Sequence, residues 1–213
     1  ASIKVNAREM QNAMSSLSTG KRINSAVDDA AGSGIASTMT ADIRGLTQAV
    51  RNSNDAISLL QTADGALIET TNMLQRMREL AVQATSGTYS TKQLSYNDKE
   101  YQALLTQIGK VASETKWNGI TTGAVNAFTF GASGNASATV NVSTVATDVA
   151  GLALTGSMVT TEALGTTAVG LVDAALDIVN GQRATLGAGV YQLTYAGDNM
   201  QNIATNTAAS RSR

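Results

Sequence analysis

Apolar residues recur every three or four positions over the first 17 residues, which is the spacing of one face of an α-helix. The members of this seam are Ile3, Ala7, Met10, Met14 and Leu17. Gly20 follows the last of them and is a common helix stop. The pattern therefore predicts a first amphipathic helix that ends near Gly20.

A much longer seam follows. From Ile35 to Ala84, apolar or small residues keep the same spacing, and a second apolar stripe runs beside them. An apolar surface this wide predicts neighbours on more than one side of the helix. If continuous, the helix has about 55 residues and a length of roughly 80 Å at 1.5 Å per residue. Residues 86–90 interrupt the pattern, and a further helix is predicted from Thr91 to about Glu114.

The middle of the chain has a different pattern. Charged residues nearly vanish over residues 119–160, where Gly, Ser, Thr, Val and Asn dominate. Residues 128–130 and 140–143 alternate with period two, and residues 131–135 between them have the composition of a turn, which predicts a β-hairpin or a small β-subdomain. From about Thr161 the helical period returns and continues to the end of the sequence.

These elements predict a mainly α fold with a small β-subdomain. The last helix has only the first helices as partners, so we expect a rod-like antiparallel bundle of long helices from both chain ends. The β-hairpin insertion would lie at the distal end. We therefore expect a discontinuous helical rod domain, residues 1–118 plus 161–213, and a small β-rich variable subdomain, residues 119–160.

The 213 residues include no His, no Cys and no Pro. Without Cys there is no thiolate nucleophile, disulfide or Cys-ligated metal, and without His there is no imidazole base. The sequence also lacks a calcium loop of the D-x-D-x-D-G type. We therefore expect no enzyme activity, no cofactor and no metal site, while the lack of Pro permits long unbroken helices.

Charge is balanced, with 15 Lys and Arg against 16 Asp and Glu, a net charge of −1. This balance lacks the basic excess that is typical of nucleic-acid binding, and it permits self-association. The most apolar run, residues 169–179, is interrupted by Asp173 and Asp177 and is too short to span a membrane. We expect neither nucleic-acid binding nor membrane insertion.

Two groups of residues are candidates for local chemistry. Ser25 with Asp28 three residues later is similar to a capping box, and Asp28 and Asp29 lie where a helix N-terminus favours anions. We interpret them as helix-cap and turn residues. A possible glycan platform is formed by aromatic side chains, with packing inside the rod as the favoured alternative. Its members are Trp117, Tyr191 and Tyr195, with Tyr101.

Several long motifs in the right order resemble bacterial flagellins. The segments LSTGKRINSA (17–26) and DDAAG (28–32) closely resemble the flagellin N-terminal signature, and GLTQAVRNSND (45–55) and QTADGAL (61–67) also match. The resemblance is strong over residues 1–122 and weaker over 161–213. The middle of the chain does not match, which is expected for the variable outer region of this family.

The resemblance implies a structural subunit of the bacterial flagellar filament, self-assembling and secreted, located in the flagellum or at the cell surface. The implied partners are other flagellin subunits, a flagellar export chaperone and the filament cap. Counterparts of the first helical residues and of the last few dozen residues of the family are missing. We therefore expect a chain that is truncated at both termini and does not polymerise by itself.

Residues 74–84, LQRMRELAVQA, look like the flagellin helix that the vertebrate innate flagellin receptor recognises. The resemblance implies five contact residues, the last of them on the following helix: Gln75, Arg76, Leu80, Gln83 and Glu100. The favoured native role of the same face is contact with the next subunit in a filament, and the two roles are compatible.

Two alternative functions remain. One is a cell-surface flagellin-like protein that binds an extracellular ligand such as a polysaccharide. The other is a hook–filament junction protein, because that class has similar chain ends. Its signature commonly has Pro after the Asp pair, where this chain has Ala30, and the sequence therefore favours the filament.

Overall fold

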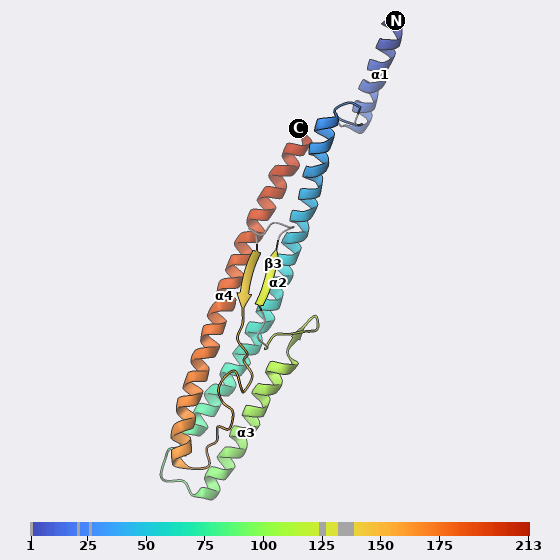
Figure 1. The fold of residues 1–213 in the computed structure, drawn as a ribbon. Helices are drawn as coiled ribbons and strands as arrows, with labels where there is room; N and C mark the ends of the chain where they lie inside the picture. Colours follow the sequence, from blue (N-terminus) through green and yellow to red (C-terminus); the bar gives the residue numbers. More distant parts are fainter. Residues whose placement is uncertain (1, 21, 26, 124–126, 132–138) are drawn as a thin grey trace. The chain divides into compact units, whose positions relative to one another are not determined.

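The computed structural model describes residues 2–20, 22–25, 27–123, 127–131 and 139–213, and its regular elements are drawn in Figure 1. The helices are α1 (Ser2–Thr19), α2 (Ala30–Ala84), α3 (Thr91–Glu114) and α4 (Glu162–Ser212). The strands are β1 (Lys116–Trp117), β2 (Ile120–Thr121), β3 (Ala127–Gly131) and β4 (Thr139–Ser143). The predicted mainly α fold with a small β part is confirmed. In the described residues, none of the helices has an apolar stretch suited to crossing a bilayer.

Helix α2 follows the predicted seam closely. It has 55 residues, and because the chain contains no Pro, no residue within it lacks a backbone N–H. From Ala49 onward the seam becomes the buried side of the helix, and Leu60, Leu74 and Met77 have no exposed surface. The spacing of apolar residues thus fixes both the helix and the side that it buries.

The chain folds as two compact units. Unit 1 comprises Ala1–Gln48 and Asn199–Arg213, and unit 2 comprises Ala49–Asp198, so α2 and α4 contribute to both. Within unit 1, Arg211 of α4 donates from Nη1 to Thr40 Oγ1 of α2 at 3.2 Å. The strands belong to unit 2 together with α3.

In unit 2, α2 and α4 lie side by side and antiparallel. Arg183 of α4 donates to Asp64 of α2, with Nε and Oδ1 2.8 Å apart. Further along α2, Arg78 Nε donates to Asp173 Oδ1 at 2.6 Å. Residue numbers therefore rise along α2 as they fall along α4. The predicted antiparallel pairing of helices from the two halves of the chain is confirmed.

Helix α3 runs back along α2 after the turn at residues 85–90. Its start is a capping box, in which Gln93 N donates to Ser90 Oγ and the Gln93 side chain accepts from Ser90 N. Its 24 residues rise about 36 Å, so that the chain leaving Glu114 lies well away from that turn. This reversal decides where the strands are placed.

The hairpin β3–β4 lies partway along α2 and α4, not at their distal end (Figure 1). Buried Val142 of β4 packs over Gly189 of α4, where an added Cβ would be 2.7 Å from Val142 Cγ2 and 3.2 Å from Leu60 Cδ1. Helix α2 continues from Leu60 to Ala84 beyond this point. The predicted distal position is therefore corrected, because α3 carries the chain back before the strands begin.

Both pairs of strands are antiparallel. In β1–β2, Trp117 pairs with Ile120 across Asn118 and Gly119, which both have positive φ as a two-residue turn requires. In β3–β4 the pairing extends from Ala127–Ser143 to Gly131–Thr139. Beyond Gly131, the predicted turn at 131–135 lies outside the described residues.

Residues 144–161 lead from β4 to α4 without helix or strand, and part of this segment is core. The side chains of Leu152, Leu154 and Val159 have no exposed surface. Backbone N of Val159 donates to Asp98 Oδ1 of α3 at 2.9 Å. This segment therefore contributes to the interior of unit 2 beside the helices.

Candidate interaction surface

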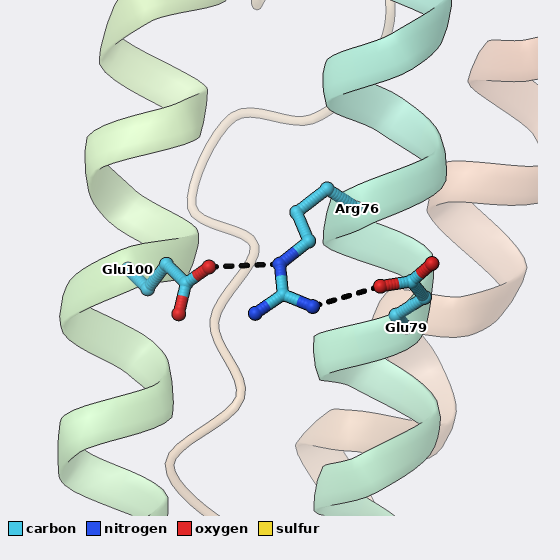
Figure 2. A network of polar contacts seen from close by, with 3 residues as sticks. All are labelled: Arg76, Glu79 and Glu100. Atoms are coloured by element: carbon cyan, nitrogen blue, oxygen red, sulfur yellow. Dashed lines mark hydrogen bonds and ion pairs between the residues drawn. The ribbon is translucent and has the colours of Figure 1, made fainter.

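A network of ion pairs on the described surface is centred on Arg76 of α2. Its Nε donates to Glu100 Oε1 of α3 and its Nη1 to Glu79 Oε2 of α2, each at 2.8 Å, as Figure 2 shows. The planar guanidinium suits this arrangement because it directs several N–H groups in one plane. The hydrogen bonds that Arg76 donates to Glu100, and then to Glu79, raise the pKa of Arg76 above its ordinary value.

The core fixes where these charges lie. Met77, next to Arg76, and Tyr101, next to Glu100, have no exposed surface and set the rotation of α2 and α3. Arg76 and Glu100 then fall at the edge of the helix pair, with their side chains about half exposed at 49% and 48%. Two predicted contact residues, 24 positions apart in the sequence, are thus in direct contact.

The other three predicted contact residues have different surroundings. Gln75 is exposed beside Arg76. Leu80 is 2% exposed and belongs to the core, so a partner cannot reach its side chain on the folded surface. Gln83 is partly buried, and its Nε2 donates to the hydroxyl of Tyr89 at 3.0 Å. The accessible part of the predicted site is therefore Gln75, Arg76 and Glu100.

Sequence reasoning missed several polar contacts. Glu79 follows Arg76 by three residues, and side chains at this spacing lie next to one another on a helix. This pair could therefore have been predicted from the sequence. The pairs Arg78–Asp173 and Asp64–Arg183 join residues 95 and 119 positions apart, and no local pattern indicates them. The hydrogen bond to Asp173 raises the pKa of Arg78.

The predicted cap residues act in two separate turns of unit 1. Asp28 Oδ2 accepts from the backbone N of Ser25 at 2.9 Å, from its hydroxyl at 3.1 Å and from Asn24 N at 3.2 Å. These hydrogen bonds lower the pKa of Asp28. The residue that caps α2 is Asp29, whose Oδ1 accepts from Gly32 N at 2.9 Å. Ser25 therefore belongs to the preceding turn.

The aromatic residues of the possible glycan platform lie in unlike surroundings. Tyr101 has no exposed surface, and its hydroxyl donates to Ser157 Oγ at 3.1 Å. Trp117 is partly buried against the core, whereas Tyr191 and Tyr195 on α4 are 69% and 73% exposed. Tyr101 is therefore no part of an exposed platform. Among the described residues, no group of three or more acidic side chains is placed to hold a metal ion.

A family model for the bacterial flagellin N-terminal helical region matches residues 1–122. The flagellin of Escherichia coli (strain K12) is 46% identical over 154 residues, which cover 69% of this chain and 31% of that protein. The flagellin of Salmonella dublin is 52% identical over 111 residues, which cover 52% of this chain and 22% of that protein. The chain therefore spans less than a third of the length of these relatives.

Solved structures give the same likeness. The crystal structure of Bacillus cereus flagellin is similar with a TM-score of 0.64 at 32% identity, covering 76% of this chain and 94% of that one. FliC from Burkholderia pseudomallei is similar with a TM-score of 0.56 at 19% identity, covering 64% and 99%. The second likeness is one of fold alone.

Proposed function

This chain belongs to the bacterial flagellin family, and we propose that it is part of a structural subunit that assembles with other flagellin subunits into the flagellar filament. The observation that carries the proposal is the family match over residues 1–122, which includes α1, α2 and α3. The role is structural and requires no catalysis. It includes export from the cell, with a flagellar export chaperone and the filament cap as further partners on the strength of the sequence resemblance.

The apolar side of α1 supports assembly. Ile3 and Leu17 are 84% and 83% exposed, and Met10 and Met14 lie between them on the same seam. A helix with an uncovered apolar stripe has a surface suited to packing against another helix. The net charge of −1 adds little repulsion between copies.

The location of the native protein tests this proposal. Antibodies raised against the purified chain are applied to the cells that produce it, and labelling is examined by immuno-electron microscopy. We expect gold particles along the flagellar filaments. Labelling confined to another part of the cell surface, with unlabelled filaments, contradicts the proposal.

We also propose that Gln75, Arg76 and Glu100 are contacted by the vertebrate innate flagellin receptor, on a surface that neighbouring subunits cover in the filament. The resemblance of residues 74–84 supports this, and so does the Arg76–Glu100 hydrogen bond, which joins the two helices at this surface. Leu80 and Gln83 then act by supporting the helices from inside, since Leu80 is buried.

Arg76→Ala tests the receptor proposal. We expect receptor activation by the chain to fall severalfold, because the substitution removes a guanidinium and also releases Glu100. Arg78→Ala is the matched control, since Arg78 is equally exposed on α2 and is paired with Asp173 instead. Unchanged activation by Arg76→Ala, with helix content preserved in circular dichroism, removes the assignment.

A further inference from the structure

The seven methionines of this chain differ widely in exposure. Met10 and Met14 on α1 are 64% and 66% exposed, whereas Met77 has no exposed surface and Met200 is 6% exposed. Methionine is usually a core residue, so two largely exposed thioethers four residues apart on one helix face are a distinct chemical feature. No other pair of described residues places two sulfur atoms together on the surface in this way.

Met10 and Met14 also lie in the middle of the α1 seam, between Ile3 and Leu17. We propose that these two methionines form an oxidation site, modified by two-electron oxidants such as hydrogen peroxide, which controls the assembly surface of α1. The effect on assembly rests on the proposed function above. The reactivity of the two thioethers rests on their exposure alone.

The reaction is balanced with peroxide as the oxidant. The lone pair of the methionine sulfur attacks one peroxide oxygen, an S–O bond forms, and the O–O bond breaks. The departing oxygen leaves as water after proton transfer. Sulfur loses two electrons and peroxide gains them, so that the thioether becomes a sulfoxide, which methionine sulfoxide reductases convert back.

The product alters the seam in a defined way. A sulfoxide is polar and hydrogen-bonding, and burying it against an apolar helix face without a partner is unfavourable. Oxidation at two adjacent seam positions therefore weakens packing between α1 and another subunit. A subunit already packed through α1 shields both sulfur atoms, so that unassembled chains are the sensitive form.

Peptide mass spectrometry of the peroxide-treated chain tests the site itself. We expect Met10 and Met14 to gain one oxygen at least about tenfold faster than Met77 and Met200, because buried thioethers react only after local opening. Met158, at 39% exposure, falls between these groups. Equal rates at Met10, Met14, Met77 and Met200 overturn the proposal, whether or not the protein forms filaments.

Assembly of the full-length subunit tests the consequence. We expect peroxide to reduce filament formation by the wild-type subunit severalfold and to leave the double variant Met10→Leu, Met14→Leu unaffected, since leucine keeps the seam apolar. Met158→Leu is the control and should remain sensitive. Equal sensitivity of the double variant overturns the role in assembly while leaving the filament function intact. Untreated subunits that form no filaments contradict the assembly role together with the proposed function.

Discussion

Helix α1 and the second half of α2 have the same apolar spacing but opposite surroundings. On α2, Leu60 and Leu74 have no exposed surface, because α3, α4 and residues 144–161 lie against that side. On α1, Ile3 and Leu17 are more than four-fifths exposed. The comparison teaches that helical periodicity predicts where an apolar face lies, while only the rest of the fold, or another molecule, determines what covers it.

The largest expected effect comes from comparing a buried leucine of α2 with an exposed leucine of α1. Leu60→Ala should lower the free energy of unfolding of unit 2 by about 3–5 kcal/mol, because it leaves a cavity in a closed core. Leu17→Ala, on the exposed seam of α1, should change the free energy of unfolding by less than about 0.5 kcal/mol. Urea unfolding followed by the fluorescence of Trp117, the single tryptophan, reports on unit 2. Similar losses for both variants contradict the contrast.

Two glycines of α4 extend the test to helix contact. A Cβ on Gly165 would be 2.9 Å from Ala84 Cβ and 3.1 Å from its carbonyl carbon, so Gly165→Ala should cost about 1–2 kcal/mol. Gly170 has open space around it, and Gly170→Ala should increase the stability by about 0.5–1 kcal/mol because Ala has the higher helix propensity. Thermal unfolding of both variants checks that Gly165→Ala destabilises the protein and that Gly170→Ala stabilises it. A stabilised Gly165→Ala shows that α2 and α4 are not closely packed there.

Two helix caps, one in each unit, give a smaller effect. Ser90→Ala removes the cap of α3 and should destabilise unit 2 by about 1 kcal/mol. Asp29→Ala removes the cap of α2 in unit 1, and we expect fraying of the first turn with no change in the Trp117 unfolding curve. Hydrogen exchange at Gly32 measures that fraying. A shifted Trp117 curve in Asp29→Ala means that the units do not respond separately.

The smallest effect is local and depends on pH. Hydrogen bonds from the backbone and hydroxyl of Ser25, and from Asn24 N, lower the pKa of Asp28. The charged carboxylate therefore stabilises this turn above the ordinary aspartate pKa of about 3.9, and the contribution is lost as pH falls through the lower folded value. The Ser25 amide chemical shift should titrate with a midpoint below the ordinary aspartate pKa, and in Asp28→Asn it should not titrate. A midpoint at or above the ordinary value contradicts the lowered pKa.

Sequence reasoning located the elements well because their boundaries are encoded locally. The seam ending at Ala84, the break at 86–90 and the loss of charge after Gly119 each mark a change that the structure follows within a few residues. The direction that a helix takes after a turn is not encoded by the local sequence in this way. Nothing near residues 85–90 states that α3 turns back along α2, and the expected distal position of the hairpin failed for that reason.

The candidate surface likewise combines features that the local sequence predicts with features that depend on the path of the chain. Arg76 and Glu100 came from a resemblance, and their contact requires the path of α3, which local spacing does not reveal. The burial of Leu80, by contrast, was available from the sequence. It follows Met77 by three residues and precedes Ala84 by four, so it lies on the core seam. The ion pairs between α2 and α4 could not be found because about a hundred residues separate their partners.

The partners of α2 also become available at different times when the chain is made from its N-terminus. Helix α3 follows after residues 85–90, so its contacts with α2 close over short loops and cost little chain entropy. The Asp64–Arg183 pair spans 119 residues, and contacts of this separation form slowly. We therefore expect α2 and α3 to associate first, leaving one side of α2 uncovered until α4 arrives. The completed core of unit 2 thus depends on α4, the last of the described helices to be made.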